Sequence, residues 1–186
     1  DTGLSEARIS INLSAGQFID VNLPKYLQAL LDEFSLPAKN FELELTEQTL
    51  VKDIDRAIEM MNSLKEMGFS FAIDDFGTGY SSLAYIKKMP VDVIKIDKSF
   101  VFGMLENHAD YQIIMSTIAM VKNLGLTVIA EGVESSAQLR SLTDNECDII
   151  QGYYFSKPIP EIELLEFLEN QVIDGHWKTA AQAVFK

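Results

Sequence analysis

Short apolar runs alternate with longer amphipathic segments from one end of the chain to the other. In Arg8–Leu13 the residues Ile9, Ile11 and Leu13 occupy every second position, with polar residues between them. This period of two is typical of a β-strand with one buried face. Comparable runs predict five further strands, at Phe41–Leu45, Phe69–Ile73, Val91–Ile96, Thr127–Ala130 and Asp148–Ile150.

The segments between these strands have helical spacing. Pro24 is placed to open a helix with an apolar stripe made of Tyr26, Leu27, Leu30, Leu31 and Phe34. Asp53 can cap the next helix and Gly68 can end it. Further helices are predicted near Ser82–Lys88, Glu106–Leu124, Ser136–Leu142 and Glu161–Val172. Residues 175–186 lose this periodicity, so we expect one domain over residues 1–174, followed by a tail or short helix.

Alternating strands and helices predict an α/β fold with parallel strands, either a doubly wound open sheet or a TIM (β/α)8 barrel. Polar residues favour the barrel, because they fall at or just past the carboxyl ends of all six strands, and these ends meet on one face of a barrel. The residues concerned are Asn12, Glu44, Asp74, Asp75, Lys95, Glu131 and Gln151. A barrel has eight strands and only six are predicted, so we expect the other two to belong N-terminal to this sequence.

Composition excludes several classes of protein. The chain has 186 residues, 15 basic against 28 acidic, and a net charge of -13, which disfavours binding to DNA and to anionic membrane surfaces. It has no apolar run of the roughly 20 residues needed for membrane insertion and no signal-peptide pattern. The single cysteine, Cys147, fits a reducing compartment. We therefore expect a cytoplasmic domain.

Asp74–Asp75 is the most informative pair, because it ends an apolar strand and precedes a glycine-rich turn. Two adjacent acids repel each other, so a half-buried pair needs a cation nearby. The polar strand ends offer oxygen and neither sulfur nor imidazole, which suits Mg²⁺ or Mn²⁺ and argues against zinc. More carboxylates than one ion requires indicate two ions, an arrangement that cleaves phosphodiesters. Lys95 adds a positive charge where a phosphate or hydroxide would sit.

Six motifs resemble those of the EAL-domain family in the family's order. They are Asn12-Leu13-Ser14, Glu44-Leu45-Thr46-Glu47, the stretch from Asp74 to Leu83, Lys95-Ile96-Asp97, the stretch from Ala130 to Glu134, and Gln151-Gly152-Tyr153. The resemblance runs from about Ile9 to Pro158. It implies a bacterial phosphodiesterase that hydrolyses cyclic di-GMP to linear pGpG, on a modified TIM barrel with one antiparallel strand.

The resemblance also implies roles for individual residues. Metal ligands would be Asn12, Glu44, Asp74 and Asp75, with Glu131 completing the environment of a second ion. Lys95, Glu131 and Gln151 would be catalytic, Lys95 by orienting the attacking water and Gln151 by holding the water network. Glu47 would brace a loop that switches between states as the domain dimerises, made of Phe76, Gly77, Thr78, Gly79, Tyr80, Ser81 and Ser82. Asp97, Glu134 and Pro158 are weaker candidates for substrate contact. Implied partners are cyclic di-GMP, a second copy of the domain, and an upstream sensor or GGDEF-type domain.

One departure from the family pattern keeps other functions open. The Glu-x-Leu motif that names the family lies on an early strand, and Asp1–Ser10 is too short to hold it. We therefore expect these 186 residues alone to be inactive. The alternative is a non-catalytic module that binds cyclic di-GMP or another protein. A Schiff-base aldolase using Lys95 is less favoured, because such a lysine needs a lowered pKa and Lys95 has acidic neighbours.

Overall fold

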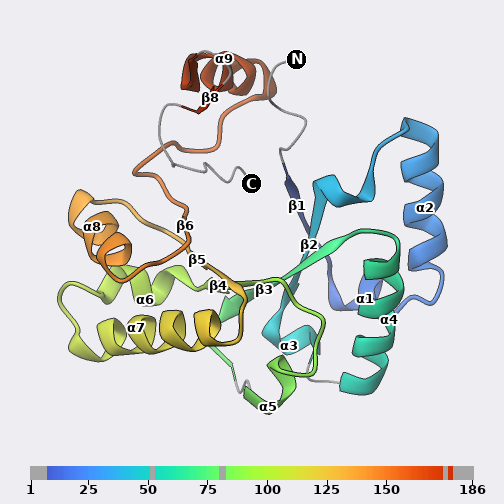
Figure 1. Ribbon diagram of the computed structural model, residues 1–186, viewed down its shortest axis with the longest axis horizontal. Helices are drawn as coiled ribbons and strands as arrows, with labels where there is room; N and C mark the ends of the chain where they lie inside the picture. The colour runs from blue at the N-terminus through green and yellow to red at the C-terminus, as the bar shows by residue number, and fades with distance from the viewer. Residues whose placement is uncertain (1–7, 51–52, 80–82, 174–175, 178–186) are drawn as a thin grey trace.

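The computed structural model describes residues 8–50, 53–79, 83–173 and 176–177. Within these residues, six parallel strands form one sheet in which each strand pairs with the next along the chain (Figure 1). The strands are β1 (Ile9–Asn12), β2 (Phe41–Thr46), β3 (Ser70–Phe76), β4 (Val93–Ile96), β5 (Thr127–Ala130) and β6 (Ile149–Ile150). All six predicted strands are confirmed.

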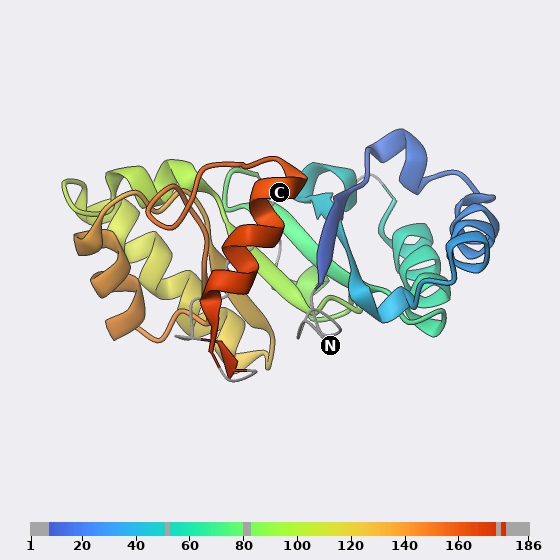
Figure 2. The ribbon, with the colours of Figure 1, turned by 90° about the horizontal axis from the view of Figure 1, so that it is seen from above.

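The sheet is curled and carries most of its helices on the convex side, which makes a half-barrel of the TIM type (Figures 1 and 2). The helices are α1 (Ala15–Phe18), α2 (Leu23–Phe34), η2 (Ala38–Asn40), α3 (Glu47–Leu50), α4 (Ile54–Glu66), α5 (Leu83–Ile86), α6 (Lys98–Gly103), α7 (His108–Asn123), α8 (Ser136–Asp144) and α9 (Glu161–Gln171). The predicted fold class is confirmed. No helix in the described ranges combines the length and apolar character needed to cross a membrane.

Most predicted helix ends are confirmed. Asp53 caps α4 by accepting a hydrogen bond from Arg56 N at 3.3 Å, and Gly68 follows that helix with a positive φ of 105°. The helix predicted near Glu106–Leu124 is α7, and it begins at His108 because the Asn107 side chain caps it at Ala109 N.

The short helices α1, η2, α3 and α6 were not predicted, because each is too short to leave a clear periodicity in the sequence. In α2, Tyr26 and Phe34 of the predicted stripe are exposed, whereas Leu27 and Leu31 pack against the core.

The C-terminal residues form a short antiparallel pair, β7 (Val172–Ile173) with β8 (His176–Trp177). Residues 178–186 lie outside the described part of the chain, and most of the expected tail or short helix falls there.

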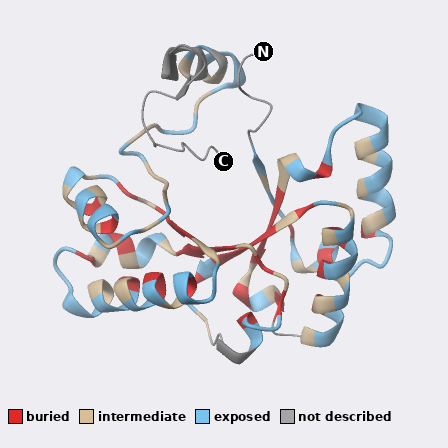
Figure 3. Ribbon diagram, viewed as in Figure 1, coloured by how far each residue is buried: buried red, intermediate tan, exposed pale blue. Residues whose placement is uncertain are grey.

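The two faces of the sheet have different surroundings. The outward face packs against the helices in the main apolar core, with Leu43, Phe71, Ile94 and Val128 fully buried (Figure 3). The concave face carries a smaller apolar cluster of Ala72, Val93 and Ile129, with Ile149 packed against it. Two residues further along each of these strands, on the same face, are Asp74, Lys95, Glu131 and Gln151. An apolar layer therefore supports a polar layer at the carboxyl ends of the strands.

The opposite ends of the strands are fixed by an arrangement that occurs twice. Asp92, just before β4, accepts hydrogen bonds from Phe71 N at 2.9 Å and from Lys65 Nζ at 2.5 Å. Asp148, just before β6, accepts from Val128 N at 2.9 Å and lies 3.5 Å from Lys122 Nζ. In each case one carboxylate joins its own strand, the preceding strand and the end of a helix.

This arrangement predicts that the backbone hydrogen bond matters more than the ion pair. We expect Asp92→Ala to lower the free energy of unfolding by about 1–3 kcal/mol, because Phe71 N loses its acceptor. Lys65→Ala should cost less than about 1 kcal/mol, because the Lys65–Asp92 pair is a third exposed and screened by water. Urea denaturation of both variants checks this, and an equal loss in the two would contradict it.

Candidate active site

The site is built around Lys95, whose side chain is completely buried at the carboxyl end of β4. Its Nζ lies 2.6 Å from Glu131 Oε1, 2.8 Å from Glu44 Oε1 and 3.3 Å from Asp74 Oδ1. These three acidic residues come from the ends of β5, β2 and β3, and each residue is less than a tenth exposed. Four strands therefore place one cation and three anions in a single buried group.

The charge of Lys95 depends on this group. Burial alone would lower the pKa of a lysine, because it disfavours the charged form. Here the negative charges of Glu131 and Glu44, and their hydrogen bonds, outweigh burial and raise the Lys95 pKa above its ordinary value. Lys95 is thus held as an ammonium ion, which is the wrong state for a Schiff-base nucleophile and the right one for stabilising an anion.

A β-bulge separates the side chains of Asp74 and Asp75. The register between β3 and β4 shifts between Ile73 and Phe76, and Asp75 takes a left-handed φ of 55°. Asp74 is buried and its Oδ1 accepts a hydrogen bond from Asp75 N at 3.1 Å, whereas Asp75 is exposed. The irregular backbone thus sends one acid to Lys95 and presents the next one to solvent.

The two amides lie at opposite ends of the site. Asn12 is exposed at the end of β1, in register with Glu44 on β2. Gln151 follows β6, and its Oε1 is buried without a hydrogen-bond partner among the described residues. A buried acceptor of this kind is suited to a water or ligand that can donate to it.

Glu47 contacts the glycine-rich loop after β3. It is buried at the start of α3, and its Oε2 accepts a hydrogen bond from Gly77 N at 3.4 Å. A Cβ on Gly79 would lie 2.7 Å from Glu47 Oε1, so the loop passes directly over the carboxylate. Thr78 closes the turn through its hydroxyl, which donates to Asp75 O at 2.8 Å. Tyr80, Ser81 and Ser82 of the predicted switch lie outside the described residues.

The weaker candidates for substrate contact are more exposed than the buried group. Asp97 caps α6, accepting from Ser99 N at 2.9 Å and from the Ser99 hydroxyl. Glu134 is exposed and offers its backbone N to Gln138 Oε1, and Pro158 is exposed in the segment before α9.

The donor set suits a hard divalent cation, because all its atoms are oxygens and most carry negative charge. In the described part of the chain, however, no three His, Cys, Asp or Glu side chains are arranged to hold a metal ion. The acids turn toward Lys95 Nζ instead. The chemistry of the residues therefore fits a metal, and binding one requires the acids to share their oxygens between Lys95 and the ion.

Comparison with known protein families decides the affiliation, since the EAL domain model matches residues 2–158. The chain belongs to the EAL-domain family. Relatives of this EAL domain include the cyclic di-GMP phosphodiesterase NbdA of Pseudomonas aeruginosa, 42% identical over 173 residues, which are 93% of this chain and 22% of NbdA. The chain thus spans about a fifth of the length of that relative.

Solved structures agree with this affiliation. The phosphodiesterase MucR of Pseudomonas aeruginosa, in complex with cyclic di-GMP, superposes with a TM-score of 0.82 at 38% identity, over 84% of this chain and 64% of that one. The EAL domain of Mycobacterium smegmatis DcpA superposes with a TM-score of 0.83 at 36% identity, over 89% of this chain and 74% of that one. The half-barrel described above is therefore shared with solved EAL domains.

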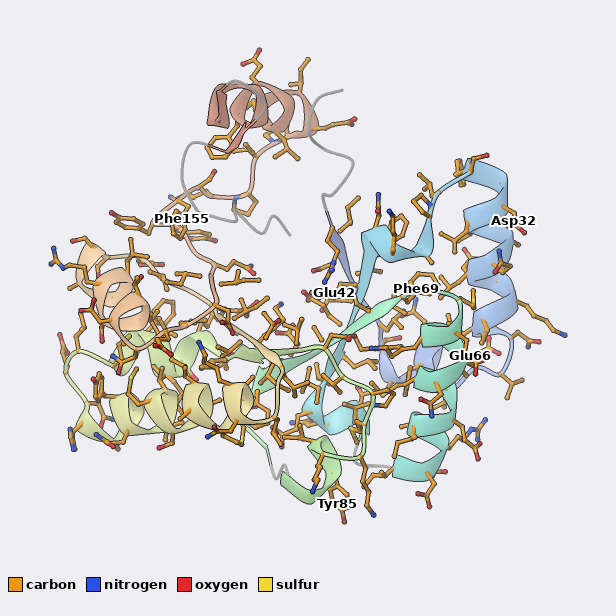
Figure 4. All side chains as sticks on the ribbon, in the orientation of Figure 1. Asp32, Glu42, Glu66, Phe69, Tyr85 and Phe155 are labelled. Carbon is orange, nitrogen blue, oxygen red and sulfur yellow. The ribbon has the colours of Figure 1, made fainter. Side chains whose placement is uncertain are left out.

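Sequence reasoning missed Glu42, which lies on the same face of β2 as Glu44. Figure 4 shows Glu42 on β2, well apart from Asp32 and Glu66 on the outer helices α2 and α4. Glu42 is 5% exposed, accepts a hydrogen bond from Ser10 Oγ at 3.2 Å and lies 3.8 Å from Arg8. Burial raises the pKa of Glu42 above its ordinary value, in spite of these two neighbours. The alternation Glu42-x-Glu44 was the available signal.

The geometry predicts that Lys95 is essential for stability of this EAL domain. We expect Lys95→Met to lower the free energy of unfolding by about 3–5 kcal/mol, because it leaves buried carboxylates without their cation. Lys65→Met is the matched control, since its ion pair with Asp92 is a third exposed and should cost less than about 1 kcal/mol. Equal unfolding midpoints in urea for the two variants would contradict this account of the site.

Proposed function

We propose that this EAL domain hydrolyses cyclic di-GMP to linear pGpG in a reaction that depends on divalent metal ions. The observation that carries the proposal is the buried group of Lys95, Glu44, Asp74 and Glu131 at one end of the half-barrel. Relatives with the same fold are named cyclic di-GMP phosphodiesterases, and one was solved with cyclic di-GMP. Metal dependence is general among EAL phosphodiesterases.

In this proposal Asn12, Glu44, Asp74, Asp75 and Glu131 hold two ions, Mg²⁺ or Mn²⁺. Such ions supply Lewis-acid stabilisation of a phosphate and a more acidic bound water. The carboxylates would turn partly away from Lys95 to share their oxygens with the ions. Because Asp74 is buried and Asp75 is exposed, Asp74 would serve the buried side of the site and Asp75 the solvent side.

Lys95 and Gln151 act on the reacting oxygens. Water attacks phosphorus, the bond from phosphorus to the 3′ oxygen breaks, and that oxygen takes up a proton, which leaves a 5′-phosphate on the linear product. The Lys95 ammonium is fixed before substrate arrives, so it can stabilise the anionic charge of attacking water or phosphate without reorganising. Gln151 Oε1 would accept a hydrogen bond from a water in the site, which its burial without a hydrogen-bond partner among the described residues supports. Asp97 and Glu134 would be weaker candidates for contact with the substrate, and Pro158 would contact a base.

Glu47 and the glycine-rich loop would link the site to assembly. The Glu47 carboxylate contacts the loop at Gly77 and Gly79, and the loop begins at Asp75, a proposed metal ligand. Movement of the loop on dimerisation would therefore move a metal ligand.

We further propose that the domain is bacterial and cytoplasmic, and that it works beside a sensor or GGDEF-type domain. The bifunctional diguanylate cyclase and phosphodiesterase MucR shows this combination of activities in one relative.

A second candidate is a module that binds cyclic di-GMP or a protein without hydrolysis. The observation that favours it is the orientation of Glu44, Asp74 and Glu131 toward Lys95 rather than around a metal position. In that case Lys95 would neutralise the acids permanently. Calorimetric titration with Mn²⁺ separates the two candidates, because only the hydrolase must bind the ion.

The first prediction concerns the acids. In the full-length protein, Glu44→Gln or Asp74→Asn should lower Mg²⁺- or Mn²⁺-dependent hydrolysis of cyclic di-GMP by more than tenfold, a barrier increase above about 1.4 kcal/mol. Glu66→Gln, on the exposed face of α4, is the control and should keep wild-type turnover. Separation of pGpG by chromatography measures the rates. Retention of more than a tenth of turnover by both site variants would remove these residues from the proposed metal site.

The second prediction separates Lys95 from the metal ligands. Lys95→Met should lower kcat by about 100-fold or more, because the transition state loses a fixed positive charge. Its affinity for Mn²⁺ should not fall, since a cation cannot ligate a metal and competes for the same carboxylates. Calorimetry on folded protein checks this. A loss of Mn²⁺ affinity as large as that of Asp74→Asn would overturn the role proposed for Lys95.

A further inference from the structure

The loops that follow β4, β5 and β6 pack closely at two glycines. A Cβ on Gly132, after β5, would lie 2.5 Å from Lys98 Cβ at the start of α6. A Cβ on Gly152, after β6, would lie 2.1 Å from Val133 O. Each of these approaches is possible only without a side chain. The segments that carry Lys95, Glu131 and Gln151 therefore form one contiguous body.

Hydrogen bonds through the fully buried Val133 strengthen this contact. Val133 N donates to Gln151 O at 3.1 Å, and Tyr154 N donates to Val133 O at 2.9 Å. The chain after β5 thus stays hydrogen-bonded to the chain after β6 beyond the end of β5 at Ala130, and it fixes the backbone on which Gln151 sits. Any shift of Val133 would be passed on to both Glu131 and Gln151.

One buried side chain joins this body to α6. Gln138, in the first turn of α8, is 7% exposed. Its Oε1 accepts hydrogen bonds from Glu134 N and Ser135 N, both at 2.9 Å, and from Ser135 Oγ at 3.1 Å. Its Nε2 donates to Val101 O in α6 at 2.9 Å. Both ends of the amide are therefore satisfied, by elements on either side of the site.

The two elements that Gln138 joins carry the two halves of an ion pair. Helix α6 begins at Lys98, three residues after Lys95, and the Glu134–Ser135 segment begins three residues after Glu131. Lys95 Nζ and Glu131 Oε1 lie 2.6 Å apart, so a small relative movement of the two elements would change their distance. A hydrogen bond between these elements limits that movement.

We propose that Gln138 is a positioning residue for the reaction, which fixes Glu131 against Lys95 through its hydrogen bond to Val101 O. This inference rests on the proposed function. The side-chain hydrogen bonds of Gln138 go to Glu134, Ser135 and Val101, so Gln138 acts through α6 and the segment after β5. Its buried amide is required because a single side chain must accept on one side and donate on the other.

A role limited to capping α8 is the simpler alternative, and the chain contains a matched case. Ser135 and Gln138 form a capping box at α8, and Ser14 and Gln17 form the same box at α1. Gln17 is exposed, and the hydrogen bonds recorded for its side chain stay within its own turn. The two glutamines share the capping function, and only Gln138 is seen to reach a second element.

Three substitutions in the full-length protein separate capping from positioning. Gln138→Glu keeps the acceptors of the capping box but cannot donate to Val101 O. Ser135→Ala removes the capping hydroxyl and leaves the Gln138 amide in place. Gln17→Glu makes the first substitution in the matched box. Steady-state kinetics with cyclic di-GMP, calorimetric binding of cyclic di-GMP in Ca²⁺ and amide hydrogen exchange are measured for each.

We expect Gln138→Glu to lower kcat by about 10- to 100-fold, the range for residues that orient catalytic groups without contacting the substrate themselves. Its KM and its Kd for cyclic di-GMP should change less than about threefold, because the substrate contacts remain. Hydrogen exchange at Val133 and Tyr154 should become faster, while exchange in β2 and β3 stays the same. Ser135→Ala and Gln17→Glu should keep wild-type kcat and wild-type exchange at these amides.

Other results would overturn the inference. The positioning role is wrong if Gln138→Glu has the same kcat as the wild type. It is also wrong if Ser135→Ala lowers kcat as much as Gln138→Glu does. If Gln138→Glu does not fold, Gln138→Met takes its place, and a kcat no lower than that of Ser135→Ala rejects the positioning role. If the wild-type protein hydrolyses no cyclic di-GMP, the proposed function fails. Hydrogen exchange at Val133 and Tyr154 then decides alone whether Gln138 holds the two elements together.

Discussion

The structure depends on keeping a lysine charged in the interior of a half-barrel. Glu131 and Glu44 raise the Lys95 pKa against the effect of burial, and Lys95 in turn allows these acids to be buried together with Asp74. Removing either the lysine or the acids would leave a buried charge without a partner and would destabilise the fold. The rest of the fold meets this requirement, because the parallel strands end at one level, the bulge in β3 turns Asp74 inward, and an apolar layer excludes water from below.

The fold could be predicted from the sequence because its signal is repeated and local. Six apolar runs at regular spacing define the strands, and polar residues at each strand end indicate a common face. The helix α6 was missed, since its six residues give little more than one turn of periodicity. The left-handed backbone at Asp75 was also missed, because it follows from the register of β3 against β4 and not from the residue itself.

The sequence predicted which residues lie at the site better than it predicted which of them contact one another. Residue type and position at a strand end identified Lys95, Glu44, Asp74 and Glu131, but not which acids would face the lysine. Glu42 was overlooked because its polar side chain lies one layer below the strand ends. The capping box of Ser135 and Gln138 is visible in the sequence, whereas the bond from Gln138 to Val101 joins elements 37 residues apart and requires the folded chain.

The paired carboxylates at the other end of the sheet divide the molecule into two regions with different tolerance to change. Asp92 and Asp148 each fix the entry of a strand to its neighbour and to a helix, at points remote from Lys95. The strand alignment is thereby secured at the amino ends, where no chemistry occurs. The loops at the carboxyl ends are then not needed to align the strands, so their residues can serve the site around Lys95.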